Sequence, residues 1–597
     1  VMGLPRHLGI HSAGMVLTRE PVGRICPIEP ARMFGRTVLQ WDKEDCAWMG
    51  LVKFDLLGLG MLSALSISFD LISQHCGRFW TLASIPRNEP GVYDMLCRGD
   101  SIGVFQVESR AQIGALPRLK PRCFYDLAVE IGLIRPGPVQ GGAVHPYIRR
   151  RTGVEPVTYP HPLLEPVLER TLGIPLFQEQ LMQMATTVGN CTAADADLLR
   201  RAMGSKRGVE RIDSLRTKLF EGMAANGIDD DTAQGIYARI ESFANFGFAE
   251  SHALSFAGLV YTSAWIKLHY PAVFLAALLR SQPMGFYSSA TLVADARRHG
   301  VVTRRPDVAR SSVGADLELL DACCEELGSE ELETGIDECL HDHDESEIGA
   351  FDPNRDDGDH RRDTHFAVRL GLSDVSGINI ETATRIVEER ERESFASLDD
   401  LARRVDLSGE EVEALALAGA FDDLVGSRRG ALWQIGQING VAPGQLDVQV
   451  VTQPPLLPEP TQMELLGDDL RATGISTADH PVRQVRDALN RRGVVQVDRL
   501  DGVETRRRIE VAGVVTHRQR PGTAGGVTFL NLEDETGLLN VIVTPGAWRH
   551  YRRVARTSRA LVVRGILERG DEGVMSLQAD RLEALDLSVP TKSRDFR

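Results

Sequence analysis

The chain has 597 residues, of which 43% are hydrophobic and 25% charged, as is ordinary for a soluble globular protein of roughly three to five domains. It contains no run of about 18 apolar residues, which excludes a membrane-spanning helix, and the N-terminus lacks the apolar core of a signal peptide. The nine cysteines are scattered without a CxxC pair. This pattern favours reduced thiols in a cytoplasmic protein over a cysteine zinc site.

The net charge of −16 is concentrated in one segment. Residues 316–359 hold 18 Asp and Glu residues against a single Arg, and the remainder of the chain is close to neutral with local basic clusters. The overall acidity is therefore poor evidence against binding of nucleic acid.

In chain order, the first informative stretch is LVKFDLLGLGML at residues 51–62. Alternate side chains of a strand share a face, so we expect Lys53 and Asp55 on one face and apolar residues filling the other. A cation and a carboxylate at the rim of an apolar sheet suit phosphate and metal chemistry. A strand-end ion pair beside a glycine turn is the alternative.

Residues 92–150 are predicted to form helices and loops, and residues 163–300 to be strongly helical. Arg135 precedes a Pro-Gly-Pro turn, which could hold its guanidinium toward a phosphate or simply expose it to solvent. Farther on, a helix over residues 197–207 ends in a basic cluster, which would either complement the helix dipole or grip a triphosphate. The cluster consists of Arg200, Arg201, Lys206 and Arg207.

The acidic segment also contains Cys323, Cys324, Cys339, His341 and His343. Their spacing fits no standard metal template, and the charge density favours a disordered and dispensable insertion.

Beyond this segment, helical periodicity returns over residues 366–440. An apolar-Gly-apolar turn before the helix at 381–392 could present backbone N–H groups to a DNA phosphate. Residues 441–480 are rich in Pro and Gln and are typical of a linker.

From Arg508 the hydrophobic period becomes two. Some five strands with a helix near residues 548–554 predict an OB-fold barrel, a fold that commonly binds single-stranded nucleic acid. Phe529 is a candidate for base stacking or for the core. Charge is supplied by Arg506, Arg507, Arg508, Arg518 and Arg520.

Several of these stretches resemble, in order, motifs of the bacterial C-family replicative polymerases, the DNA polymerase III alpha (DnaE) family. They are VKFDLLGLGMLSAL, GDSIGVFQVESR, IGLIRPGP, ADLLRRAMGSKR and FGFAESHALSFA. The Ala249-Glu250 pair, with the sequence that follows, is similar to the error-prone, ImuC-type branch.

The resemblance implies roles for individual residues. Asp55 would be the third catalytic carboxylate and a metal ligand, with Lys53 facing the incoming nucleotide. The implied nucleotide and phosphate contacts are Arg135, Arg200, Arg201, Lys206, Arg207, His252 and Lys267. The implied DNA contacts are Gly377, Ile378 and Asn379 of a helix-hairpin-helix, and Arg518, Arg520 and Phe529 of the OB-fold.

Asn379 departs from the family pattern, and His252 has an alternative structural role. Asn379 stands where the family usually has a second Gly, and Asn tolerates the positive φ of such a turn. For His252 the alternative is a position next to a helix N-cap, with Ser251 as the capping residue.

The function implied is error-prone DNA polymerisation in translesion synthesis, by nucleotidyl transfer with two Mg²⁺ ions. Implied partners are primer–template DNA, deoxynucleoside triphosphates, an ImuB-type accessory protein and, through it, the sliding clamp. The family's PDxDxDF motif is absent from this sequence and would lie upstream of Val1, so we expect a C-terminal portion with an incomplete metal site.

A non-catalytic DNA-binding module of a larger assembly is the alternative. An unrelated phosphoryl-transfer enzyme would need a P-loop, and GxxxxGK[ST] does not occur.

The predicted fold class is multidomain, α/β plus α plus β. The predicted parts are the end of a polymerase palm (1–78), large helical fingers (79–300), a connection with the acidic insertion (301–365), a helix-hairpin-helix region (366–440), a linker with a small helical segment (441–504), a C-terminal OB-fold barrel (505–588) and a tail (589–597).

Overall fold

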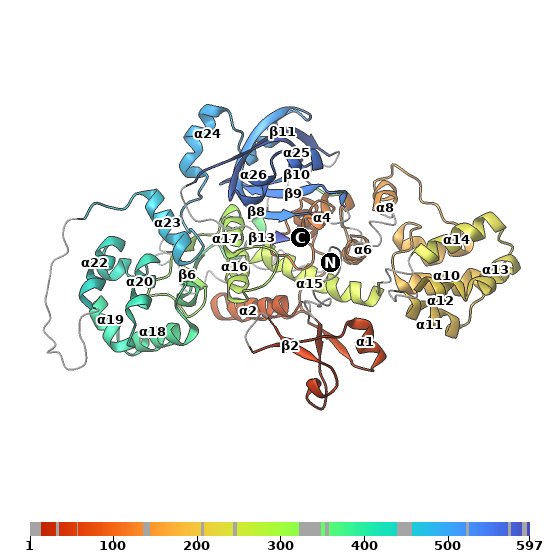
Figure 1. Cartoon of the computed structure of the whole chain (residues 1–597), viewed down its shortest axis with the longest axis horizontal. Helices are drawn as coiled ribbons and strands as arrows, with labels where there is room; N and C mark the ends of the chain where they lie inside the picture. The colour runs from red at the N-terminus through yellow and green to blue at the C-terminus, as the bar shows by residue number, and fades with distance from the viewer. Residues whose placement is uncertain are drawn as a thin grey trace. The chain divides into compact units, whose positions relative to one another are not determined.

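The computed structural model describes residues 14–31, 35–56, 58–134, 144–203, 208–242, 248–320, 348–352, 357–438, 457–520, 524–570, 575–587 and 594–596. The chain divides into two compact units, one combining residues 1–63 with 127–259 and the other combining 64–126 with 260–597 (Figure 1). Within the described ranges, no helix is both long and apolar enough to cross a membrane.

Short strands open the first unit. The strand β1 (Gly14–Val16) pairs antiparallel with β4 (Lys53–Asp55), and β2 (Ile28–Pro30) pairs with β3 (Thr37–Leu39). Helix α1 (Lys43–Trp48) precedes β4. Gly58, with φ of +98°, turns the chain from β4 into α2 (Leu59–Cys76), a conformation that side chains with a Cβ rarely adopt.

The rest of the first unit is helical, and Figure 1 shows α10 to α14 gathered as one group. Gly189 of α10 and Gly222 of α13 let these helices cross closely, since a Cβ on Gly222 would lie 2.0 Å from the Gly189 carbonyl oxygen. The helices are α8 (Val144–Arg151), α9 (Glu165–Leu168), α10 (Gln178–Gly189), α11 (Ala193–Ala202), α12 (Gly208–Asp213), α13 (Arg216–Ala225) and α14 (Asp230–Ser242).

The second unit is built on α16 (Pro271–Arg280), whose residues from Pro271 to Leu279 are all buried. The Asp363 carboxylate accepts the backbone N–H groups of Ala272 at 2.7 Å and Val273 at 3.1 Å, which caps this helix. This unit also contains α3 (Pro90–Cys97), α4 (Arg110–Ile113), α5 (Leu116–Leu119) and α17 (Ser289–Arg298). Helices α6 (Phe124–Leu133) and α15 (Glu250–His269) each contribute residues to both units.

A three-stranded sheet corrects the expected start of the acidic insertion. Strand β6 (Asp316–Leu319) pairs antiparallel with β7 (Phe366–Arg369), which also pairs with β5 (Thr303–Arg304). Glu318 binds Arg304 at 2.8 Å, so the first acidic residues belong to a folded sheet. Most of the predicted insertion, residues 321–347 and 353–356, lies outside the described residues.

Small helices form the next region, around a shared apolar core. They are α18 (Ile380–Arg392), α19 (Leu398–Val405), α20 (Gly409–Leu417), α21 (Asp422–Val425) and α22 (Arg428–Ile438), followed by α23 (Gln462–Ala472) and α24 (Arg486–Arg492).

The C-terminal strands close into the predicted barrel. Their order is β11-β12-β10-β9-β8, and β8 pairs again with β11. The strands are β8 (Arg508–Gln519), β9 (Thr528–Glu533), β10 (Leu538–Val543), β11 (Ala560–Arg569) and β12 (Met575–Ala584), with β13 (Arg594–Phe596) beside β8. Helices α25 (Pro545–His550) and α26 (Arg552–Thr557) connect β10 to β11, which confirms the predicted OB-fold.

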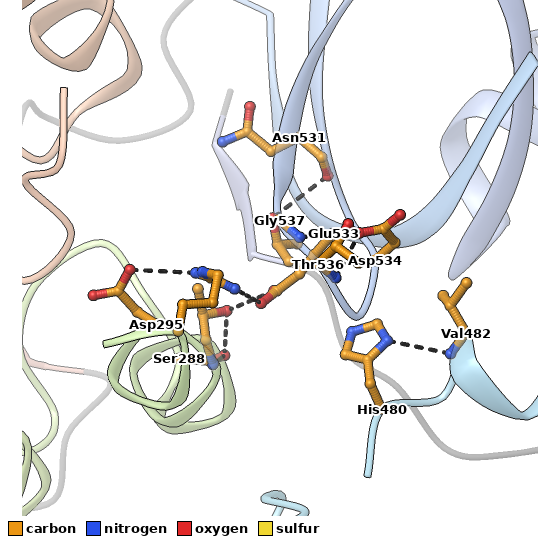
Figure 2. Close-up of polar contacts among 12 residues, drawn as sticks. Ser288, Asp295, His480, Val482, Asn531, Glu533, Asp534, Thr536 and Gly537 are labelled. Atoms are coloured by element: carbon orange, nitrogen blue, oxygen red, sulfur yellow. Dashed lines mark hydrogen bonds and ion pairs between the residues drawn. The ribbon is translucent and has the colours of Figure 1, made fainter. Parts of the chain in front are cut away.

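The turn from β9 to β10 is held by one carboxylate (Figure 2). Asp534 accepts the backbone N–H groups of Thr536 at 2.8 Å and Gly537 at 3.0 Å. The preceding residue, Glu533, is buried, and its carboxylate accepts a hydrogen bond from the Thr291 hydroxyl of α17 at 3.3 Å. Burial raises the pKa of Glu533 to about 7, against the opposing attraction of Arg298.

Candidate functional site

The predicted carboxylate lies at the end of β4. In the register with β1, Asp55 is opposite Gly14, Phe54 opposite Met15, and Lys53 opposite Val16. Lys53 is half-buried, and strand alternation puts its position on the same face as that of Asp55. The expectation that apolar residues fill the other face is wrong for this chain, because Val52 is 60% exposed and Phe54 46% exposed.

The basic cluster of the fingers is described at two of its positions. Arg200 and Arg201 lie at the end of α11 and share the Asp197 carboxylate, at 2.8 Å and 2.7 Å respectively. Both guanidiniums are largely exposed, and such surface ion pairs contribute little stability, so an anionic ligand can replace Asp197 at small cost. Arg135, Lys206 and Arg207 lie outside the described residues.

His252 is exposed in the first turns of α15. Its ring packs on Phe256, with ring centroids 4.1 Å apart, and edge-on against Phe248. The alternative in which Ser251 caps the helix is wrong, because α15 already begins at Glu250. The N–H of Glu250 is bound instead by the Glu179 carboxylate at 2.9 Å.

Lys267, which was predicted to contact phosphate, is buried and pairs with two carboxylates. Its side chain is 3% exposed, and its Nζ lies 2.7 Å from Asp100 and 2.8 Å from Asp295. Asp100 also binds His299 at 2.5 Å, and its charge outweighs burial and raises the pKa of His299 to about 9. Lys267 therefore neutralises a buried carboxylate pair, and this role corrects the one expected from the resemblance.

The helix-hairpin-helix turn differs from expectation at two residues. Gly377 has φ of +99°, but Asn379 has φ of −84° and acts as the N-cap of α18, where its side chain accepts the Thr382 N–H at 2.7 Å. Ile378 is buried in the core of this region and donates its N–H to the Val375 carbonyl at 3.0 Å. Asn379 thus starts a helix instead of replacing a left-handed glycine.

The OB-fold residues separate into structural and accessible ones. Arg518 is 8% exposed and donates to the Ala555 carbonyl at 2.9 Å and to the Ser558 carbonyl, so its predicted role in DNA contact is wrong. Phe529 is half-buried and lines a small cavity with Tyr287 and His517. Arg520 is exposed, with its guanidinium 5.5 Å from the centroid of the Trp548 ring.

Helices α25 and α26 carry a basic surface that the sequence analysis did not single out. We call it the arginine stripe, and it consists of the exposed residues Arg549, Arg552, Arg553 and Arg556. Their spacing of three and four residues puts them along one side of a helical path, and no Asp or Glu occurs between residues 545 and 559. This spacing, together with Trp548, was the signal available in the sequence.

Models of four protein families match parts of this chain. Residues 1–58 match the model of the bacterial DNA polymerase III alpha NTPase domain, and residues 61–227 match that of the bacterial DNA polymerase III alpha subunit finger domain. Residues 300–431 match a helix-hairpin-helix motif, and residues 509–585 match an OB-fold nucleic acid binding domain.

Whole-chain relatives agree with these matches. The error-prone DNA polymerase of Mycolicibacterium paratuberculosis is 52% identical over 600 residues, covering 100% of this chain and 51% of that protein. The enzyme of the same name from Corynebacterium glutamicum is 49% identical, covering 100% of this chain and 52% of that protein. The chain belongs to the DNA polymerase III alpha family, in its error-prone branch.

The chain spans about half the length of the curated relatives that it matches. Among the described residues, Arg200, Arg201 and His252 lie in the first unit with β4, whereas Lys267, Gly377 and Arg520 lie in the second.

Proposed function

We propose that the chain is the part of an error-prone DNA polymerase that carries one catalytic carboxylate, the fingers and two DNA-binding regions. One observation carries this proposal: identity of 52% continues over the whole chain to a protein named error-prone DNA polymerase. The reaction is transfer of a nucleotide from a deoxynucleoside triphosphate to a primer 3′-hydroxyl.

Asp55 is the proposed carboxylate of this reaction. A metal ion supplies charge stabilisation on the transferred phosphoryl group when bound. A single strand-end carboxylate beside the Lys53 ammonium does not fit a pair of Mg²⁺ ions, because two divalent cations need several carboxylates to offset their repulsion. Asp55 is therefore proposed as one ligand among several, with the others contributed from outside this chain. Lys53 would face the phosphates of the incoming nucleotide.

The triphosphate contacts are proposed at Arg200 and Arg201, together with Arg135, Lys206 and Arg207. The exposed guanidiniums of the first two support this assignment, since each pairs with the Asp197 carboxylate at the surface. His252 is a further candidate, because its ring is exposed on a helix of the same unit. Lys267 is excluded from this group by its two buried carboxylate partners.

DNA contacts are proposed on the OB-fold and at the Gly377 turn. The arginine stripe supplies positive charge for the phosphate backbone, and Arg520 with Trp548 supplies a ring and a cation for base stacking. By the family resemblance, we further propose that the polymerase acts in translesion synthesis with an ImuB-type partner that contacts the sliding clamp.

The test uses a longer protein that joins this chain to the remaining half of its relatives' length. On a primed template with an abasic site, that protein should insert a nucleotide and extend past the site, and it should misinsert on an undamaged template. Failure to extend any template, with DNA binding retained, would instead favour a non-catalytic DNA-binding module.

A further inference from the structure

A second group of ionisable side chains lies away from the proposed polymerase residues. Glu89 is the N-cap residue of α3, His269 is the last residue of α15, and His360 ends a short 3₁₀ helix, Gly358–His360. The side chains of Glu89, His269 and His360 are 8%, 0% and 12% exposed. One ligand atom of each lies within 4.8 Å of the others. We call this group the Glu-His-His cluster.

The hydrogen bonds of the Glu-His-His cluster require one more positive charge than the neutral His269 ring supplies. His269 Nδ1 lies 2.9 Å from the His360 carbonyl oxygen, and His269 Nε2 lies 2.8 Å from the Glu89 carboxylate. A carbonyl only accepts, so Nδ1 carries the proton of the neutral ring. The lone pair of Nε2 then faces a carboxylate, an arrangement that is stable only with a second proton or a cation between them.

Two further atoms of the cluster are buried without a hydrogen bond among the described residues, Glu89 Oε1 and His360 Nδ1. Glu89 Oε1 lies 2.8 Å from His269 Nε2 and 3.4 Å from His360 Nδ1, so both imidazole rings face the same carboxylate oxygen. Trp265 Nε1 donates to Glu89 Oε2 at 2.9 Å, which holds the carboxylate in place. The bond from the His269 ring to a backbone carbonyl is the contact that commonly orients a metal-bound histidine.

A neighbouring cluster in the same unit provides the comparison. Asp100, Asp295 and His299 also meet within 4.8 Å, but Lys267 lies between the two carboxylates and supplies their cation. In the described part of the chain, no lysine ammonium pairs with Glu89 of the Glu-His-His cluster. Arg362 stacks over the Trp265 ring at 5.7 Å, and its two terminal nitrogens have no hydrogen-bond partner in the described structure.

We propose that Glu89, His269 and His360 bind one divalent transition-metal ion, of which zinc fits best. Two imidazole nitrogens and one carboxylate oxygen form a ligand set suited to zinc, which prefers tetrahedral coordination at about 2.0–2.2 Å. The edge of such a tetrahedron is about 3.4 Å, which matches the 3.4 Å between Glu89 Oε1 and His360 Nδ1. The 2.8 Å between His269 Nε2 and the Glu89 carboxylate lengthens by about 0.6 Å when the ion binds between them. The ion joins α3 and α15 to the segment that follows the acidic region.

The packing of the His360 ring provides a second kind of test. A Cβ on Gly91 of α3 would lie 2.7 Å from His360 Nε2. Gly91→Ala therefore displaces the ring while every ligand side chain is retained. If the cluster binds metal, this substitution should weaken binding in the same direction as loss of His360.

The experiment measures zinc by elemental analysis in the purified full chain, followed by titration of the chelated protein with Co²⁺, whose visible absorption reports tetrahedral coordination. The wild type should retain about one zinc per chain. His360→Ala should lose it, with at least a 100-fold weaker Co²⁺ affinity. His299→Ala, in the cluster already filled by Lys267, is the matched control and should keep the metal.

Absence of zinc together with an absorption spectrum of octahedral Co²⁺ would overturn the proposal and leave a protonated His269 as the account. Equal metal retention by His360→Ala would overturn this ligand set. Chelation of the wild-type protein decides even where a variant fails to fold, because removal of a structural ion should lower the melting temperature and re-addition of Zn²⁺ should restore it.

Discussion

Large apolar side chains are exposed around the strand pair β1–β4, which carries Asp55, and buried in the OB-fold. Between residues 14 and 62, large apolar side chains are exposed on nearly every element, with Trp48 at 86% and Val52 at 60%. No large apolar residue of the described OB-fold, residues 508–587, is similarly exposed, and Leu530, Val541 and Val563 are fully buried. The barrel closes its own core, whereas the strand pair has an uncovered apolar face, as expected of a site completed by other polypeptide.

The largest expected effect concerns the strand pair. In the longer polymerase, Asp55→Asn keeps the side-chain shape and removes its charge, so nucleotide incorporation should fall about 10³-fold, equivalent to about 4 kcal/mol of barrier. Lys53→Ala should reduce incorporation less, through weaker nucleotide binding. Single-turnover incorporation measures both changes, and an unaffected Asn variant with native circular dichroism would place the active site elsewhere.

Truncation of apolar side chains tests the comparison itself. Leu530→Ala creates a cavity in the barrel and should cost about 3 kcal/mol. Phe54→Ala removes a ring that is 46% exposed and should cost about 1 kcal/mol or less. Hydrogen exchange of amides in β8–β12 and β1–β4 reports each local effect, and equal costs would contradict the difference drawn between the two regions.

The arginine stripe tests whether the closed barrel binds nucleic acid. Replacing Arg549, Arg552, Arg553 and Arg556 by Ala should weaken binding of single-stranded DNA by about tenfold or more and reduce its salt dependence, since fewer counterions are released. Fluorescence anisotropy at two salt concentrations measures this. Arg518→Ala is the control, because this buried guanidinium donates to the backbone carbonyls of Ala555 and Ser558, and its loss should lower stability with the salt dependence unchanged.

The smallest expected effect is on pH dependence. Glu533 has a pKa of about 7 in the folded barrel against 4.5 as its ordinary value, so it favours folding below pH 4.5 and loses that contribution as pH rises through 7. Glu533→Gln should remove this dependence and gain on the order of 1 kcal/mol at pH 8 relative to the wild type. Melting temperatures from pH 5 to 8 measure the change, and parallel profiles for the two proteins would refute it.

Much of the architecture could be predicted because it depends on local patterns. The period of two after Arg508 and the turn residues around Asp534 specify a closed barrel, and the alternation of Lys53 with Phe54 specifies β4. Family membership then followed from short motifs. Local pattern also marked α11, whose basic end is described at Arg200 and Arg201.

The individual site residues were harder to predict, because long-range partners decide the role of a charge. The sequence places Asp100 and Asp295 far from Lys267, yet both carboxylates meet its ammonium in the fold. From the sequence, Arg518 is expected to be a surface cation, but in the fold its guanidinium is buried and donates to the Ala555 carbonyl. Asn379 could be either a left-handed turn residue or a helix cap, and only its backbone φ decides.

Primer extension by this chain alone, compared with extension by the longer protein, tests the central claim most directly. Both proteins should bind a primed template through the same OB-fold surface. The account predicts metal-dependent extension by the longer protein and none by the chain alone, because Asp55 by itself cannot hold two divalent cations. Robust extension by the chain alone would contradict the account.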